Sequence, residues 1–442
     1  MGRRDVVLGA DVGSTNVKVV ALDAAGHIVA RVRRPTPRRT GEVSIDAMVL
    51  FELFEELVIE ACGGELAAVA VCAAGVGEDG VLVDEDGHPL DAALAWFDPR
   101  RTALFHELEP ELSPAAGLGV VTDAARTLVG WAWAARRPGA ERAKTWLALT
   151  DFASCRWSGV DFMSDTLAAR TAAWQVRGRT WAEDRVRATL GSPGLLPAVL
   201  RAGDIVGPLR SERLRDAGVL AAQAVVVAGG HDHPIGGWGV DRLSPGAVLD
   251  SMGTAEVVVA QSMSIISAGE GIDTAPGIGS TGSTLLRVEE LARNVEWASQ
   301  DPAVAAALQQ MISGALPPDG YLSSGTFRPG AAGGARPRYT ADAPAAPTSR
   351  ASAVLGALAA LGNQAVQDIS ALVPDRSRVF TAGGWARSHG WIEIKQAVTG
   401  RPVTVITEPE TTAAGAALLA ARALGWSPDP ATTLAYAPAP VP

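Results

Sequence analysis

Cysteine is scarce in this sequence. The 442 residues include 3 cysteines, Cys62, Cys72 and Cys155, and no two of them form a CxxC pair. An odd number without metal-ligand spacing argues against both a disulfide framework and a zinc ribbon. We therefore expect a protein of the reducing cytoplasm.

Long apolar segments and basic blocks are also missing. Nowhere do about 18 uninterrupted apolar residues occur, and the first residues, MGRRDVVLGAD, reach Asp and Gly before an apolar stretch develops. The 38 Lys and Arg against 48 Asp and Glu give a formal net charge of −10. No Lys/Arg block is interleaved with aromatic residues. We expect no export signal, no membrane span and no nucleic-acid partner.

The length and composition indicate a folded protein of two domains. Hydrophobic residues make up 48% and charged residues 19%, and a chain of this length suits two domains of about 200 residues each. Residues 5–34 read as three short strands in an antiparallel meander. A strand, a Gly-Thr turn and a second strand recur at 246–261, which indicates two pseudo-repeated halves.

The remaining patterns place the other elements. Residues 45–62 have apolar residues at helical spacing, and AAVAVCAAG and GVLVD then read as buried strands. Residues 123–200 indicate a helical lobe broken at the PG and SPG turns. Residues 321–350 lack a periodic pattern and predict a long irregular connection. The tail from Pro428 is expected to dock only loosely.

The segment GADVGSTNVK at residues 9–18 is the first candidate site. It places Asp11 at the end of a buried strand, directly before a Gly-Ser-Thr turn. Backbone N–H groups of such a turn form an anion-binding concavity. A dinucleotide-binding or Walker-type loop would open a helix, whereas the residues from Val17 continue as a strand, so neither fits. An ordinary hairpin with a glycine turn remains the alternative.

A carboxylate follows another buried strand in VVVAGGHDHPIGGWG at 225–239. Asp232 stands at the carboxyl end of that strand, where it is well placed for chemistry. Phosphoryl transfer to a hydroxyl needs a carboxylate that takes the proton and positive charge on the phosphates. Asp232 suits the first role and Asp11, through magnesium, the second. His231 and His233 are too close in sequence to favour a zinc site.

Two glycine-containing turns in the second half complete the pattern. In SMGTAE at 251–256, Gly253 allows close backbone approach and the next residue, Thr254, adds a hydroxyl. In TAGGWARSHGW at 381–391, two glycines leave room for a flat ring such as adenine. Read in isolation, the Gly-Gly pair is an ordinary turn.

In this order, the segments resemble the FGGY carbohydrate kinases, relatives of glycerol kinase and xylulokinase in the hexokinase/actin ATPase superfamily. The resemblance is carried by GADVGSTNVKVVALDAAGHIVA at 9–30, AWFDPRRT at 95–102, GGHDHPIGGWG at 229–239, SMGTAE, TAGGWARSHGW and PETTAAGAALLAA at 409–421. It implies an α/β fold of two actin-like, ribonuclease H-like domains around a central cleft. Residues 1–240 would hold the sugar site and the catalytic base, and residues 241–442 the ATP site.

The resemblance also implies roles for individual residues. Asp232 would be the catalytic base and would share a magnesium ion with Asp11. ATP would meet Gly13, Ser14, Thr15, Lys18, Gly253, Thr254, Gly383, Gly384 and Ser388. The sugar would meet Glu78, Trp96, Asp98, Arg100 and His231, together with Asp232. Gly77, where glycerol kinases have Arg, and His233, where Gln is common, put glycerol in doubt as the substrate.

The sequence leaves alternatives. An actin-like ATPase or a catalytically inactive sugar-sensing homologue would share the hairpins, but the polar and aromatic set from Glu78 to Arg100 favours an enzyme. Asp98 and Arg100 could instead form a structural ion pair. We expect ATP-dependent phosphorylation of a terminal hydroxyl of a ketose or alditol in carbohydrate catabolism, with ATP and Mg²⁺. The partner is then a small-molecule sugar or polyol, and a homodimer is left open.

Overall fold

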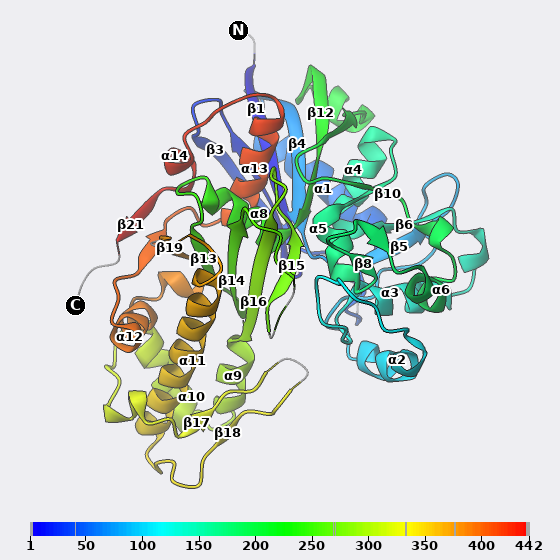
Figure 1. Ribbon diagram of the computed structural model, residues 1–442. Helices are drawn as coiled ribbons and strands as arrows, with labels where there is room; N and C mark the ends of the chain where they lie inside the picture. Colours follow the sequence, from blue (N-terminus) through cyan, green and yellow to red (C-terminus); the bar gives the residue numbers. More distant parts are fainter. Residues whose placement is uncertain are drawn as a thin grey trace. The chain divides into compact units, whose positions relative to one another are not determined.

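The structure is a computed structural model. It describes residues 3–39, 41–267, 269, 271–331, 334–374 and 377–438. The chain divides into two compact units, each described by itself below (Figure 1). The first unit comprises Met1–Gly239, Ser262–Thr284 and Thr412–Thr433, and the second comprises Val240–Gln261, Leu285–Thr411 and Leu434–Pro442.

Six strands form the main sheet of the first unit, in the order β11-β12-β4-β1-β2-β3. Their bounds are Arg4–Val12 (β1), Asn16–Leu22 (β2), Ile28–Pro35 (β3), Leu66–Gly75 (β4), Ile205–Pro208 (β11) and Leu220–His231 (β12). β1, β2 and β3 are antiparallel neighbours, which confirms the meander predicted at residues 5–34. β4 pairs in parallel with β1 on one side and with β12 on the other. The three central strands therefore end at the same edge.

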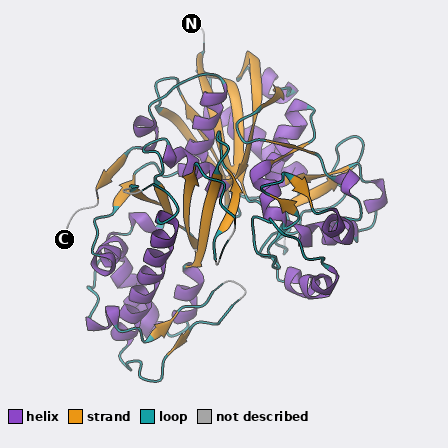
Figure 2. Cartoon of the chain, in the orientation of Figure 1, coloured by secondary structure: helices purple, strands orange, loops and turns teal. Residues whose placement is uncertain are grey.

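One face of this sheet is covered by α1 (Ala47–Cys62) and α4 (Leu149–Ser158). α1 begins where Asp46 accepts the backbone N–H groups of Met48 and Val49, as expected of a helix cap. Its Leu50 and Phe54 side chains are buried with alternate residues of β1. The helix predicted at 45–62 is confirmed, and Figure 2 shows such helices (purple) beside the strands (orange).

The opposite face is covered by α13 (Thr411–Ala423), whose residues from Thr412 onward belong to the first unit. The approach is close, because a Cβ added to Gly9 of β1 would lie 2.0 Å from the carbonyl oxygen of Ala413. Gly239 meets Gly415 in the same way, with its added Cβ 3.0 Å from the Gly415 Cα. The small residues of the last helix thus permit backbone-to-backbone packing.

A lobe is inserted between β4 and β11. Its elements are β5 (Gly80–Val83), α2 (Arg100–Leu108), α3 (Thr127–Ala135), β6 (Thr145–Ala148), β7 (Phe162–Ser164), α5 (Asp165–Ala168), β8 (Trp174–Gln175), β9 (Thr180–Trp181), α6 (Glu183–Thr189) and β10 (Ala198–Leu200); α7 (Glu212–Asp216) follows β11. β15 (Asp273–Pro276) joins it through the hydrogen bond from Thr274 N to Gly119 O, 2.6 Å long. The helical lobe predicted at 123–200 is present, with short strands between its helices.

The second unit carries strands in the order β16-β14-β13-β19-β20-β21. The bounds of these strands are Val248–Met252 (β13), Ala255–Ser262 (β14), Ser283–Glu290 (β16), Val379–Ala382 (β19), Thr404–Ile406 (β20) and Tyr436–Pro438 (β21). The helices of the second unit are α9 (Ala292–Ala298), α10 (Pro302–Ser313), α11 (Pro347–Ser370) and α12 (His389–Thr399). Helix α8 (Asp232–Asp241) precedes β13 in the chain. β13 pairs antiparallel with β14 and parallel with β19, just as β1 pairs with β2 and β4. The pseudo-repeat predicted from the sequence is confirmed.

Two expectations need correction. Residues 321–350 are mostly irregular, but they include the hairpin β17 (Phe327–Arg328) and β18 (Arg338–Tyr339). The tail expected to dock loosely forms α14 (Pro430–Leu434) and then β21, which pairs with β20. Composition alone was misleading here, because backbone pairing to an existing sheet edge needs no long apolar side chains.

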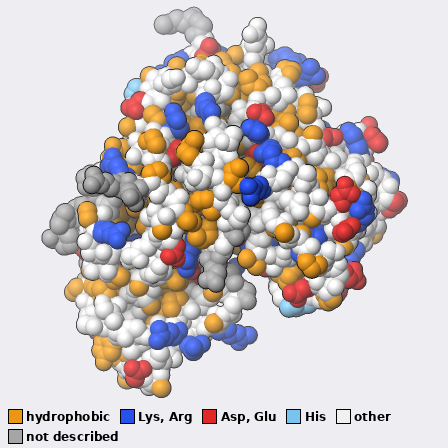
Figure 3. Space-filling model, viewed as in Figure 1, with side chains coloured by type: hydrophobic (Ala, Val, Ile, Leu, Met, Phe, Trp, Pro, Cys, Tyr) orange, Lys and Arg blue, Asp and Glu red, His pale blue; other side chains and the backbone are white. Residues whose placement is uncertain are grey.

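Arginine side chains gather on the β17–β18 hairpin, where Figure 3 shows a blue group in its lower part. Arg328, Arg336 and Arg338 are exposed there. This is a small patch compared with the extended basic stripe typical of nucleic-acid-binding domains. Among the described residues, no helix is long and apolar enough to span a bilayer.

A buried carboxyl group in α4 makes stability depend on pH. Burial raises the pKa of Asp151 from 3.8 to about 7. Because the folded state then holds a proton that the unfolded state releases, stability is full below pH 4 and is lost as the pH rises to 7, by about 1.4 kcal/mol per pH unit. We expect Asp151→Asn to lack this loss. Urea unfolding from pH 4 to 8 should show its free energy of unfolding rising relative to wild type; parallel curves would contradict the assignment.

Candidate active site

Three strand ends meet at Gly75, the last residue of β4. Val12 of β1 and His231 of β12 are both registered opposite Gly75. Because the carboxyl ends of parallel strands share one edge, Asp11 and Asp232 are brought there from opposite sides of β4. Glu78 follows β4 at the same edge. The first unit thus gathers three of the carboxylates that the sequence singled out.

The two glycines before Asp232 are required by close contacts. A Cβ added to Gly229 would lie 1.8 Å from the Ala73 carbonyl oxygen of β4. Gly230 has a φ of 148°, and its added Cβ would lie 2.0 Å from Thr166 Oγ1 and 2.5 Å from Ser164 Oγ. Both positions exclude side chains, since backbone and buried hydroxyls occupy the space. This explains the Gly-Gly pair in the segment 225–239.

A chain of buried hydrogen bonds fixes the end of β12. Asp151 accepts the backbone N–H of Ser164 at 2.8 Å, and the Ser164 hydroxyl donates to the Gly229 carbonyl at 2.7 Å. The Thr166 hydroxyl lies 3.0 Å from that of Ser164 and accepts the His231 backbone N–H at 3.0 Å. The residue before the candidate base is therefore held by side chains of the lobe.

Asp232 begins α8 with a side chain that is 23% exposed. His231 Nε2 lies 3.2 Å and His233 Nε2 3.8 Å from its Oδ1. Burial raises the pKa of Asp232 above its ordinary value; His233 opposes this, and the neighbouring carboxylates of Asp11 and Glu78 add to it. Burial also lowers the pKa of His231 well below its usual range, so this imidazole is neutral. A raised pKa suits a carboxylate that accepts a proton.

The Gly-Ser-Thr turn after β1 is held from several elements. Trp96 donates its indole N–H to Ser14 Oγ at 2.9 Å, and Arg38 donates to the Ser14 carbonyl at 2.5 Å. Lys18 forms an ion pair with Asp11, with 2.9 Å between Nζ and Oδ2. Trp96, which the resemblance assigned to the sugar, therefore contacts the turn assigned to the phosphates.

Glu78 belongs to a buried network that the sequence did not reveal. Arg170 donates to Glu78 at 2.8 Å and to Asp273 at 2.8 Å. Arg126 also lies beside Asp273, with 3.4 Å between the charged atoms. Gly77 leaves room for this arrangement, since its added Cβ would lie 2.7 Å from Arg170 Cγ. No local motif signals the Arg170 contacts, because they join residues 92 and 103 positions apart in the chain.

Asp98 and Arg100 pair with each other, which is the alternative left open above. Arg100 donates to both carboxylate oxygens of Asp98, at 2.9 and 2.7 Å. This pairing lowers the pKa of Asp98. The neighbouring Arg101, which the sequence did not single out, is buried and donates to the backbone carbonyls of Ala95 and Glu78. Arg101 thus connects the loop before α2 to Glu78, in the loop that follows β4.

The second unit brings together the other two turns. Gly253 and Thr254 lie exposed in the β13–β14 turn, and the hairpin's Met252 is fully buried. Gly383 follows β19 with a φ of 94°, and its added Cβ would lie 2.2 Å from the Met252 carbonyl oxygen. Gly384 is next to it, and Ser388 directly precedes α12. The candidate phosphate and adenosine turns are thus in direct backbone contact.

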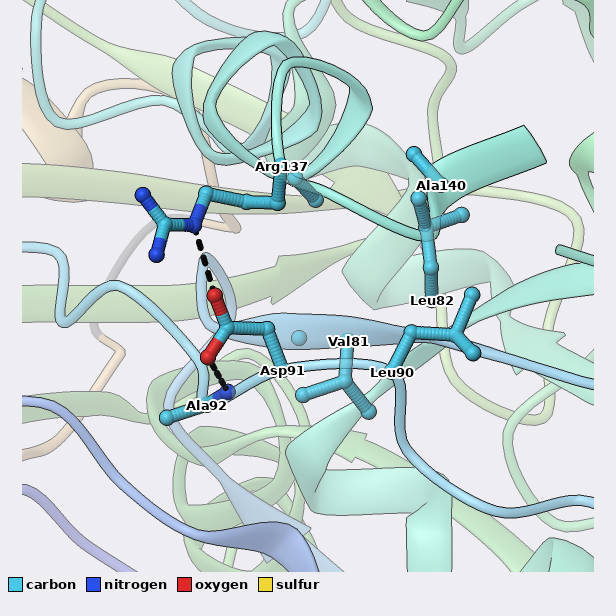
Figure 4. Close-up of a pocket in the computed structure, with 9 residues that line it drawn as sticks. Val81, Leu82, Leu90, Asp91, Ala92, Arg137 and Ala140 are labelled. Carbon is cyan, nitrogen blue, oxygen red and sulfur yellow. Dashed lines mark hydrogen bonds and ion pairs between the residues drawn. The ribbon is translucent and has the colours of Figure 1, made fainter. Parts of the chain in front are cut away.

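The lobe also contains a small cavity that none of the candidate site residues lines. Figure 4 shows Arg137 and Asp91 pointing toward each other across it; the 2.6 Å bond from Arg137 Nε joins them. Val81, Leu82 and Leu90 complete the apolar side. The cavity measures about 10 Å³, which is the size of one water molecule. It lacks every candidate site residue and is not a sugar site.

Comparison with known proteins identifies the family. Residues 6–239 match the N-terminal domain, and residues 278–424 the C-terminal domain, of the FGGY family of carbohydrate kinases. The chain is 26% identical to an L-fuculokinase from Escherichia coli strain K12, covering 96% of this chain and 92% of that protein. It is 27% identical to a xylulose kinase from Streptomyces coelicolor, covering 95% and 88%.

Solved structures agree on the fold. The crystal structure of xylulose kinase from Rhodospirillum rubrum matches with a TM-score of 0.82 at 19% identity, covering 98% of this chain and 93% of that one. The chain therefore belongs to the FGGY family of carbohydrate kinases and has their two-domain actin-like fold. It is an enzyme that phosphorylates a hydroxyl of a sugar with ATP. The comparisons give no support to an actin-like ATPase or a sugar sensor.

The hydrogen bond from His231 to Thr166 yields a prediction. We expect Thr166→Val to lower kcat by about tenfold or more, because it removes the acceptor that fixes the backbone before Asp232. Thr166→Ser keeps the hydroxyl and should retain most of the activity. Steady-state kinetics with a fixed sugar and varied ATP would measure both. A Val variant with wild-type kcat and unchanged stability would show that this bond does not position the base.

Proposed function

We propose that this enzyme phosphorylates a neutral ketose, or the related alditol, at a terminal hydroxyl, with Asp232 as the base. The observation that carries the proposal is the charge balance around Asp232. Lys18, Arg126 and Arg170 are each already paired with a carboxylate. A neutral polyol can use such groups as hydrogen-bond donors and acceptors, whereas an acidic sugar would meet uncompensated negative charge.

The names of the relatives support this substrate class. Two of them, the L-fuculokinase and the xylulose kinase, are named for ketoses and align with almost the whole chain. The gluconokinase from Bacillus subtilis is 20% identical and aligns with 57% of the chain. We therefore favour a pentulose or hexulose over an aldonate.

Each side chain has a role in the proposed reaction. Asp232 orients the attacking hydroxyl and takes its proton, and the neutral His231 beside it holds the carboxylate in place without adding charge. Glu78, oriented by Arg170, accepts hydrogen bonds from sugar hydroxyls. Removing a partner from such a buried group costs about 1–3 kcal/mol, which is the basis for rejecting sugars that lack one hydroxyl.

The residues fit a magnesium ion, which prefers oxygen ligands and binds through one or two carboxylates together with phosphates. Asp11 and Asp232 are two carboxylates close enough for Asp11 to raise the pKa of Asp232. Bound there, the ion would neutralise charge on the phosphates. Asp11, whose carboxylate is paired with Lys18, would hold it.

We further propose that residues 1–240 supply the sugar site and the base, and that residues 241–442 bind ATP. Gly253 and Thr254 would meet the phosphates, and Gly383, Gly384 and Ser388 would border the adenosine. A cytoplasmic location is supported by the cysteines, since all three are free and buried.

The assignment of the base predicts the effect of Asp232→Asn. Amide replacement removes proton acceptance and leaves the surroundings intact, so kcat should fall by about two orders of magnitude or more while ATP still binds. Asp241→Asn, at the other end of α8, is the matched control and should keep its activity. A pre-steady-state assay of ADP formation, combined with calorimetry of ATP binding, measures both effects. Near-normal turnover of Asp232→Asn would exclude it as the base.

The charge balance predicts a substrate ranking. In a coupled assay of ADP release, a ketose such as xylulose or fuculose should give a kcat/KM at least about tenfold above gluconate and glycerol. The same ranking should hold at high ionic strength, because the carboxylates are buried and poorly screened. Gluconate or glycerol as the best substrate would overturn the proposal.

A further inference from the structure

Three charged side chains meet inside the second unit, beneath the β13–β14 turn. Lys395 of α12 places its Nζ 2.6 Å from Asp250 Oδ2 of β13 and 2.5 Å from Glu256 Oε1 of β14. The three side chains are only 4%, 3% and 2% exposed. Asp250 and Glu256 stand on either side of residues 251–255, the segment that contains Gly253 and Thr254. One ammonium group therefore ties together the two ends of the candidate phosphate turn.

The charges of this cluster are mutually dependent. Burial lowers the pKa of Lys395, but Asp250 and Glu256 outweigh it and raise the pKa above its ordinary value. Burial, with the neighbouring Asp250, raises the pKa of Glu256 above its ordinary value, and Lys395 opposes this. The Lys395 ammonium therefore lies between two carboxyl groups and donates to one oxygen of each.

Stability alone does not explain such a cluster. Apolar side chains of similar volume in place of a buried ion pair are often neutral or stabilising, because both ions must be taken out of water. What this cluster does provide is a fixed geometry, since the Lys395 ammonium donates to one oxygen of Asp250 and to one oxygen of Glu256. These contacts therefore fix the position of the β13–β14 turn.

The surrounding residues clamp the base of the turn and leave its tip open. A Cβ added to Gly362 of α11 would lie 1.9 Å from Glu256 Oε1, so this helix lies directly against the carboxyl group. Trp391 of α12 donates its indole N–H to Met252 Sδ at 3.0 Å. At the tip, a Cβ on Gly253 would meet nothing within 4 Å. The turn is rigid where it is buried and accessible where a ligand would bind.

We propose that Lys395 is a positioning residue for nucleotide binding: by joining Asp250 to Glu256 it holds the Gly253–Thr254 turn in the conformation that receives the phosphates of ATP. Lys395 itself is buried and does not touch the nucleotide. This inference rests on the proposed role of that turn in nucleotide binding. The experiment must therefore test the role of Lys395 separately from the role of the turn.

The main test is Lys395→Met, which keeps an unbranched side chain and removes the charge. We expect the KM for ATP and the dissociation constant of MgADP from calorimetry to rise by about tenfold or more, with the KM for the sugar unchanged. Lys144→Met, which removes a lysine exposed in the lobe and paired with Asp161, is the matched control and should leave all three values unchanged. A purely structural role would lower the unfolding temperature and the active fraction without moving the KM for ATP.

A further variant keeps the test decisive. If Lys395→Met fails to fold, the triple variant Asp250→Leu, Glu256→Gln, Lys395→Met removes the buried charges altogether and should fold, yet still bind MgADP weakly. A folded triple variant with wild-type MgADP affinity would overturn the inference.

Gly253→Val distinguishes the proposed role of the turn in nucleotide binding from the proposed positioning role of Lys395. If it weakens MgADP binding and Lys395→Met does not, the positioning role is wrong and the nucleotide turn stands. If neither variant changes MgADP affinity, the proposed role of the turn fails and the inference fails with it.

Discussion

The pairing of β4 with two parallel neighbours is the constraint on which the candidate active site of this kinase depends. Val12 and His231 are both registered with Gly75, so β1 and β12 must end at the same level. The approach leaves no room for a side chain, because a Cβ on Gly75 would lie 2.5 Å from the Val12 carbonyl oxygen. A shift of one residue in β1 would turn Asp11 to the other face of the sheet, and a shift in β12 would move Asp232 away from the same edge. The distance between Asp11 and Asp232 is thus set by backbone hydrogen bonds rather than by the two side chains.

The sequence predicted the features that are local in the chain. Asp11 and Asp232 were singled out because each stands at the end of a buried strand beside glycines, and the structure places both at the edge where β1, β4 and β12 end. The Gly253 and Gly383 turns were also visible, although the sequence did not show that Gly383 lies against the Met252 backbone. The strand pattern and the helix at 45–62 follow from apolar periodicity, and the pseudo-repeat follows from the recurrence of strand, turn and strand at 246–261.

Long-range contacts could not be predicted in the same way. Arg170 pairs with Glu78 and Asp273, and Lys395 with Asp250, across separations of 92, 103 and 145 residues. A single Arg or Lys in a helix usually indicates a solvated face, so nothing in its neighbourhood marks it as buried. The Asp98–Arg100 pair shows the opposite error. The sequence suggested that these two charged residues bind a ligand, but they form an ion pair with each other, and only the structure reveals this.

Buried charge has different consequences in the two units. In the first unit the arginines pair with carboxylates near the end of β4, and Arg170 holds Glu78 through its Oε1. In the second unit Lys395 lies behind the turn, and its partners leave it no route to a ligand. Arg101 has a comparable supporting place in the first unit, because its bonds to the Ala95 and Glu78 carbonyls connect Glu78 to the loop of Trp96, which in turn is bonded to Ser14. A displacement of Glu78 would therefore act on the Gly13–Thr15 turn through the hydrogen bonds of Arg101 and Trp96, all within one unit.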